Sequence, residues 1–196
     1  MNGIYFAMVV VMAVQVGYYS RQIYRQEIEP TLATWLVFSL GTILSTISYL
    51  LSQEKEIVSG VLIMADALTV FLITTSVYVF GKRKGGRLVL WEKWYLVGIA
   101  VIVVYGVFSG DAFGSNLFTQ ILICTGYIPV VKKMVSTKTN HESFVGWVCA
   151  FMNGALGMVP AIVSGNTLAI IYGARTVVLV GSFLALMTYY ERRKTQ

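Results

Sequence analysis

The sequence has few of the side chains on which most enzymes and metal proteins depend. It contains one histidine, His141, in a polar loop, and two cysteines, Cys124 and Cys149, each in the middle of an apolar run. A metal site or a histidine-based nucleophile pair needs several such groups close together, so neither is predicted and no cofactor is expected. No disulfide framework is expected either. We therefore predict that the chain is not an enzyme.

Charged side chains are also scarce. They occupy 12% of the 196 positions, against 57% for hydrophobic side chains, and this balance would not keep a domain of this size in water. The apolar runs are continuous, whereas the strands of a membrane barrel alternate between apolar and polar residues. Because a chain in lipid must satisfy its own backbone hydrogen bonds, the composition predicts an all-α integral membrane protein.

Seven apolar runs have the length of about 20 residues that a helix needs to cross ~30 Å of hydrocarbon. We therefore predict seven transmembrane helices, with no soluble domain between or beside them. The runs lie at residues 4–24, 31–52, 57–80, 91–108, 115–135, 143–163 and 168–190.

The basic residues lie almost entirely in alternate loops. Of the 15 lysines and arginines, all but Lys55 and Arg175 fall on the side that holds the C-terminus. Basic loops stay in the cytoplasm, so we predict an outside N-terminus, a cytoplasmic C-terminus and a location in the plasma (inner) membrane. The net charge of +6 is explained by these basic loops, which set the orientation in the membrane and contact anionic lipids. We therefore predict the lipid bilayer as a partner, and the charge is no evidence for nucleic-acid binding.

The two halves of the chain repeat the same order of short motifs. Residues 17–20 and 126–129 read GYYS and GYIP, a tryptophan follows a polar loop in each half, and residues 57–60 and 162–165 both read IVSG. A three-helix unit that begins outside ends inside, so a second copy in the same orientation needs one extra crossing. We therefore predict a first three-helix repeat at 1–81, a linker with a fourth helix at 82–113, and a second repeat at 114–196.

Seven helices in a 3 + 1 + 3 plan, an outside N-terminus, and the run at 126–129 followed by a basic loop and Trp147 resemble the PQ-loop and SWEET (MtN3) superfamily of small-solute membrane transporters. The resemblance covers about the whole chain, although the family's Pro-Gln pair reads Pro129–Val130 in the second repeat and is absent from the first. It implies alternating access between two three-helix bundles, with Pro129 and Pro160 as candidate hinges. It also implies a solute site near the midplane in helices 3 and 7.

Two charged residues, Asp66 and Arg175, lie within otherwise apolar predicted spans. At 1.5 Å per residue both lie roughly 10 to 14 Å below the outer boundary, near the middle of the membrane and at equivalent levels of the two repeats. An ionised group there costs at least ~2.5 to 3.5 kcal/mol, so it normally faces a partner, a cavity or a substrate pathway. Further polar residues predicted near this level are Asn153, Tyr172 and Gln15.

Three interpretations of Asp66 and Arg175 remain open from the sequence. They can form a permanent ion pair that joins the two repeats. They can instead bind a solute, with Arg175 taking a carboxylate or phosphate and Asp66 an amine or a proton. In the third interpretation, the pair opens to admit the solute.

Other polar and aromatic residues have structural explanations. We expect all four tryptophans to be interfacial anchors. Asn153 is equally explained by helix packing and by solute contact, and packing is favoured for Gln15 and Gln120.

We thus expect a transporter or facilitator for a small polar or zwitterionic solute. The alternative is a seven-helix receptor or sorting protein that binds its ligand without moving it, as the KDEL receptors of similar fold do. Homo-oligomerisation, the identity of the solute, proton coupling and the direction of transport are left open.

Overall fold

The computed structural model describes residues 2–52, 57–81, 88–108 and 112–194, in which every regular element is a helix. Six stretches are long and apolar enough to cross a membrane, which confirms an all-helical, multi-pass integral membrane protein. The predicted basic segment at 82–87 lies outside the described residues. In chain order the helices are α1 (Asn2–Tyr24), α2 (Leu32–Leu51), α3 (Ile57–Phe80), α4 (Leu90–Phe108), α5 (Ala112–Thr125), α6 (Tyr127–Thr137), α7 (Phe144–Ser164) and α8 (Thr167–Lys194).

The predicted single helix at 115–135 is wrong in one respect, because it is divided into α5 and α6 at Gly126. Pro129 has no backbone N–H, so the carbonyl of Thr125, four residues earlier, loses its helical partner. The hydroxyl of Tyr95 donates to that carbonyl instead, at 2.6 Å. A Cβ on Gly126 would lie 2.6 Å from a ring carbon of Phe38, so the junction is also a point of close packing.

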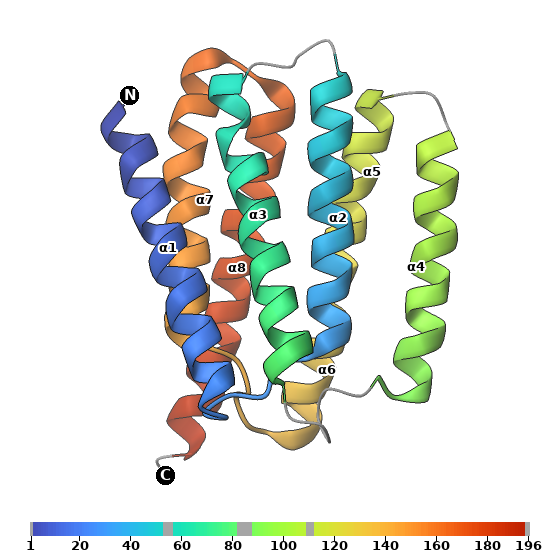
Figure 1. Cartoon of the computed structure of the whole chain (residues 1–196), viewed down its shortest axis with the longest axis vertical. Coiled ribbons are helices and arrows are strands. Elements are labelled where there is room, and N and C mark those ends of the chain that lie inside the picture. Colours follow the sequence, from blue (N-terminus) through green and yellow to red (C-terminus); the bar gives the residue numbers. More distant parts are fainter. Residues whose placement is uncertain (1, 53–56, 82–87, 109–111, 195–196) are drawn as a thin grey trace.

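The helices form two groups of similar internal order (Figure 1). In the first, α3 packs between α1 and α2; in the second, α8 packs between α7 and α5. The groups meet through α1 against α7 and α2 against α5, with α3 against α7 and α8 at the centre. Helix α4 stands at one edge, where it packs on α5 and α2. The two chain ends lie at opposite ends of the bundle.

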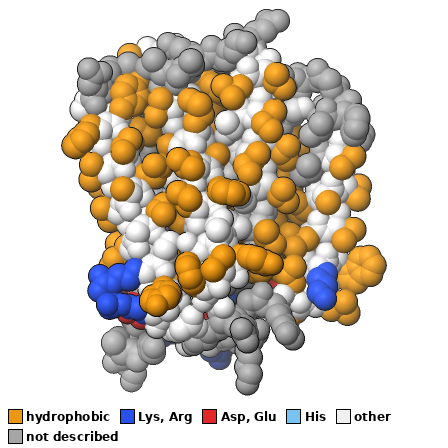
Figure 2. All heavy atoms as spheres, in the orientation of Figure 1, with side chains coloured by type: hydrophobic (Ala, Val, Ile, Leu, Met, Phe, Trp, Pro, Cys, Tyr) orange, Lys and Arg blue, Asp and Glu red, His pale blue; other side chains and the backbone are white. Residues whose placement is uncertain are grey.

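The outer surface is apolar along the length of the helices. Figure 2 shows hydrophobic side chains spread over this face, with lysine and arginine confined to its lower end. That end holds the loop between α1 and α2, the helix α6 and the C-terminus (Figure 1). We refer to it as the basic end, and to the opposite end as the N-terminal end.

Small residues allow close packing both between the two groups, at Gly157, and within the second group, at Gly173. A Cβ on Gly157 of α7 would lie 2.6 Å from the terminal carbon of Leu62 on α3, and a Cβ on Gly173 of α8 would lie 2.5 Å from Met158 on α7. Lipid tails are as apolar as the helix surfaces, so no hydrophobic driving force brings helices together in a bilayer. Helices in lipid therefore associate largely through such close backbone approach.

We predict that Gly157→Ala lowers the free energy of unfolding by about 1–3 kcal/mol, because the added methyl group must displace Leu62. Thermal or denaturant unfolding in detergent micelles would measure the loss. The control is Gly17→Ala on α1, where nothing lies within 4 Å of the added carbon, so no loss is expected. Equal losses in both variants would contradict this account of the interface.

Candidate functional site

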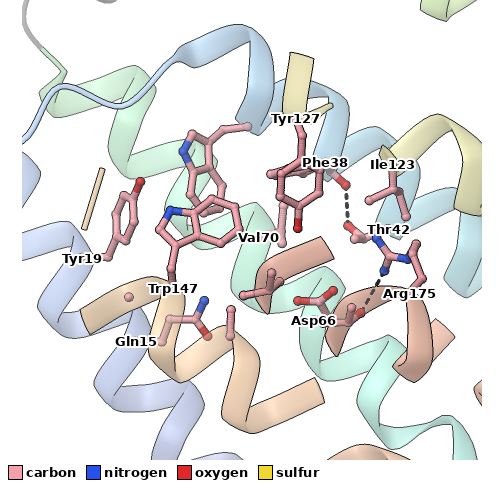
Figure 3. Close-up of a pocket in the computed structure, with 15 residues that line it drawn as sticks. Gln15, Tyr19, Phe38, Thr42, Asp66, Val70, Ile123, Tyr127, Trp147 and Arg175 are labelled. Atoms are coloured by element: carbon pink, nitrogen blue, oxygen red, sulfur yellow. Dashed lines mark hydrogen bonds between the residues drawn. The ribbon is translucent and has the colours of Figure 1, made fainter. Parts of the chain in front are cut away.

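A small cavity lies where the two groups of helices meet. Its volume is about 40 Å³, enough for about two or three water molecules. Figure 3 shows Asp66 and Arg175 at one side of it, Gln15 and Trp147 at the other, and the hydroxyl of Tyr127 pointing inward. The lining comes from both groups of helices and consists of Gln15, Tyr19, Trp35, Phe38, Thr42, Asp66, Val70, Ile123, Tyr127, Gly146, Trp147, Ala150, Arg175, Thr176 and Val180.

Asp66, on α3, is held by a hydrogen bond from the opposite group. The hydroxyl of Tyr172, on α8, donates to Asp66 Oδ2 at 2.5 Å. Tyr172 is fully buried. Because the alternative for each group is an unsatisfied polar atom in an apolar interior, this bond fixes the carboxylate firmly.

Arg175, one turn further along α8, lies against the same tyrosine. Its guanidinium carbon is 4.5 Å from the centroid of the Tyr172 ring, a cation–π contact. One terminal nitrogen donates to the hydroxyl of Thr176 at 3.1 Å. The buried Nε atom has no hydrogen-bond partner among the residues that the structure describes.

Asp66 and Arg175 therefore share Tyr172 without forming a direct ion pair. Among the residues the structure describes, an ion pair is formed by Arg25 and Glu27 near the basic end. The interpretation of a permanent direct pair between Asp66 and Arg175 does not hold in this conformation. Both charges keep unused bonding capacity beside the cavity.

The remaining predicted site residues divide into two groups. Gln15 is buried and lines the cavity. Asn153 does not line it; its side-chain oxygen is buried without a partner, and the adjacent Gly154 packs on Thr176, as a helix-packing face would. Pro160 lies inside α7, and Pro129 lies just past the break between α5 and α6, both outside the cavity lining. Their hinge role stays a prediction.

The predicted packing role of Gln120 has a direct structural counterpart. Its amide donates to the hydroxyl of Ser45 at 2.9 Å and to the side chain of Asn116 at 3.1 Å, and Asn116 in turn donates to the Ser45 carbonyl at 3.0 Å. This buried cluster ties α5 to α2. Polar groups of this kind join helices in lipid.

Two of the four tryptophans are not interfacial anchors, contrary to the prediction. Trp35 and Trp147 are only 3% and 4% exposed, and their ring centroids lie 5.9 Å apart. They belong to an aromatic cluster that closes the cavity toward the basic end. Other contacts in the cluster are Tyr19–Trp35 at 5.0 Å, Phe38–Tyr127 at 4.9 Å and Trp147–Phe183 at 4.6 Å.

Glu142, beneath this aromatic cluster, is the functional candidate that the sequence did not reveal. Its side chain is only 3% exposed although it belongs to the loop between α6 and α7. The carboxylate accepts hydrogen bonds from the hydroxyl of Tyr19, the backbone N–H of Thr31 at 3.3 Å and the indole N–H of Trp147 at 3.4 Å. One carboxylate thus joins both groups of helices at the basic end.

Neighbouring loop contacts reinforce this closure. The backbone N–H of Glu29 donates to the carbonyl of His141 at 3.1 Å, and the ammonium of Lys133 donates to the carbonyl of Glu29 at 2.6 Å. At the N-terminal end, the amide of Asn166 donates to the hydroxyl of Tyr49 at 3.2 Å, which joins the start of α8 to α2. Hydrogen bonds therefore join the two groups of helices at both ends of the bundle.

Comparisons with protein-family models, with curated proteins and with solved structures returned no match. The described residues also contain no group of three or more histidine, cysteine, aspartate or glutamate side chains placed to hold a metal ion.

Burial raises the pKa of Glu142 above the ordinary value of 4.5, although its hydrogen-bond donors act in the opposite direction. The folded protein then binds this proton more tightly than the unfolded chain. The free energy of unfolding attributable to Glu142 should fall as the pH rises from about 4.5 through the pKa of the folded state.

We predict that Glu142→Gln removes this part of the pH dependence, because glutamine keeps the shape and one acceptor but cannot ionise. Unfolding measured at several pH values in wild type and variant gives the difference directly. The difference, wild type minus variant, should decrease with rising pH. A difference that is flat or rises would show that the folded protein does not disfavour the ionised carboxylate.

Proposed function

We propose that the protein is a transporter or facilitator for a small polar or zwitterionic solute, which it binds in the cavity between its two groups of helices. The observation that carries this proposal is that two oppositely charged side chains, Asp66 and Arg175, line the same cavity and form no direct ion pair with each other. Charges at this depth are costly, and they are retained most often where a substrate or ion uses them.

The proposed architecture is seven transmembrane helices as two parallel three-helix repeats joined by α4, with the N-terminus outside and the basic end in the cytoplasm. The contact pattern supports it. In this plan α1 corresponds to α5–α6, α2 to α7, and α3 to α8. Exchanging the two repeats therefore turns the contact between α1 and α7 into the contact between α5 and α2, and both contacts are present. In each half the third helix packs between the first two, as equivalent repeats require. The resemblance to the PQ-loop and SWEET superfamily rests on this plan.

The charges indicate which solutes fit. Arg175 Nε is a buried donor with no partner, and a carboxylate or phosphate would satisfy it. The carboxylate of Asp66 would accept an amine while it keeps its bond from Tyr172. The aromatic side chains on the remaining wall suit an apolar or aromatic portion of the same solute.

The cavity of about 40 Å³ is too small for most solutes of this class, so binding requires the two groups of helices to separate. Hydrogen bonds between the two groups at both ends of the bundle are what an intermediate between outward-facing and inward-facing states would have. Opening at the basic end must break the hydrogen bonds of Glu142, and opening at the other end must break the bond between Asn166 and Tyr49.

The test combines binding with flux. Purified protein would be screened for a thermal shift against amino acids, sugars, nucleosides and vitamins, and hits would then be tested for uptake into proteoliposomes. A ligand at 100 times its dissociation constant should add ~2.7 kcal/mol to the free energy of unfolding. We predict that Arg175→Gln and Asp66→Asn each lower uptake at least about tenfold by removing a charged hydrogen bond.

The control is Arg21→Gln, an exposed charge at the basic end that lies outside the cavity lining and should leave uptake unchanged. Ligand binding without uptake would contradict transport and favour the receptor alternative. A thermal shift that survives in both cavity variants would contradict the assignment of the site to Asp66 and Arg175. Circular dichroism and gel filtration would verify that each variant is folded.

A further inference from the structure

A second and larger pocket lies at the basic end, away from the central cavity. It has a volume of about 330 Å³ and is formed by the start of α2, the start of α4 and one face of α6. The central cavity shares none of its lining residues. A ligand bound in this pocket would therefore not occupy the proposed solute site.

Two lysines of α6 give the pocket a cationic side. The ammonium of Lys132 lies 4.0 Å from the centroid of the Trp91 ring on α4, and that of Lys133 lies 2.6 Å from the carbonyl oxygen of Glu29. These contacts hold both ammonium groups at the pocket wall. An ammonium carries three donors, so each lysine can also bind a phosphate oxygen.

Two glutamates give the same pocket an anionic side. Glu92 is only 8% exposed, and its Oε2 atom accepts a hydrogen bond from the backbone N–H of Val89 at 3.0 Å, which fixes the carboxylate at the start of α4. In the described part of the chain it makes no direct ion pair. Glu29 also lines the pocket. A purely anionic ligand would be repelled by these carboxylates, and a purely cationic one by the lysines.

The rest of the wall combines the apolar side chains of Leu32, Val89 and Pro129 and the ring of Trp91 with the hydroxyl groups of Thr31 and Ser136. The pocket lies at the ends of candidate spans that begin at Leu32 and end at Thr137, where the headgroup region of a bilayer would be. The adjacent Trp94 is 69% exposed, as an interfacial anchor on α4 would be. Apolar side chains beside charges of both signs at this level match a phospholipid better than a soluble metabolite.

We propose that this pocket binds the headgroup of a zwitterionic phospholipid that carries a primary amine. Lys132 and Lys133 bind its phosphate, and the carboxylate of Glu92 binds its ammonium group. The headgroup then bridges α4 to α6 and to the start of α2. This bridge holds the edge helix α4 to the bundle.

The experiment measures the thermal unfolding of the full-length protein in detergent with added phosphatidylethanolamine, phosphatidylcholine or phosphatidylglycerol, and with water-soluble phosphoethanolamine. Phosphatidylethanolamine should raise the unfolding temperature most, because the quaternary amine of phosphatidylcholine cannot donate a hydrogen bond to Glu92 and phosphatidylglycerol has no amine. Glu92→Gln keeps an oxygen that can accept the hydrogen bond from the Val89 N–H, but it should abolish the preference for phosphatidylethanolamine over the other lipids.

A double variant, Lys132→Gln with Lys133→Gln, should weaken the apparent affinity for phosphatidylethanolamine at least about tenfold, since two charge-assisted bonds are lost. Ser136→Trp should do the same by filling the pocket without changing its charge, and it provides the test if the lysine variant does not fold. The matched control is Lys93→Gln, an exposed charge beside Glu92 that does not line the pocket and should retain binding.

Each of three results would overturn the proposal. Equal stabilisation by phosphatidylglycerol, unchanged in Glu92→Gln, would mean a site for anions alone. Equal stabilisation by soluble phosphoethanolamine would mean that the ligand is not a lipid. A loss in Lys93→Gln as large as in the double lysine variant would mean attraction by the general positive charge of this end.

Discussion

The contact of Tyr172 with both Asp66 and Arg175 is the interaction on which the interior of this protein depends. Each ionised group would be costly in an apolar environment, and each is stabilised by a different part of one side chain, the hydroxyl for the carboxylate and the ring face for the guanidinium. The two charges are thereby kept close without cancelling each other. In a direct ion pair the two charges would satisfy each other and would be less available to bind a solute.

Aromatic rings and buried hydrogen bonds surround this contact. On the side toward the basic end, aromatic rings from both groups of helices meet, and the buried carboxylate of Glu142 accepts hydrogen bonds from Tyr19, Thr31 and Trp147. Close backbone approach at Gly157 brings α3 and α7 together on the other side. Because a low dielectric strengthens charge interactions, these largely apolar surroundings make the two charges more effective as ligands.

The sequence was sufficient for much of the fold and for part of the site. Lipid permits few alternatives to helices, so apolar runs alone located the helices within a few residues. Depth along the helices also identified Asp66, Arg175, Gln15 and Tyr172 as interior polar groups. The division of the predicted helix at Gly126 was missed. Pro129 leaves the carbonyl of Thr125 without a helical partner, and the sequence does not reveal that the hydroxyl of Tyr95 donates to this carbonyl. Glu142 was missed and Trp147 was wrongly predicted to be an interfacial anchor for a related reason: only the folded loops show that the indole of Trp147 donates a hydrogen bond to the buried carboxylate of Glu142.

The most direct test of the account is whether the central cavity opens to each side of the membrane in turn. With Cys124 and Cys149 replaced by serine, Ala150→Cys would place a single thiol in the cavity lining. A membrane-impermeant thiol reagent would be added from one side of proteoliposomes and then from the other. The account predicts labelling from both sides, slowed in each case by bound solute. Labelling from one side only would contradict alternating access and leave a static binding site.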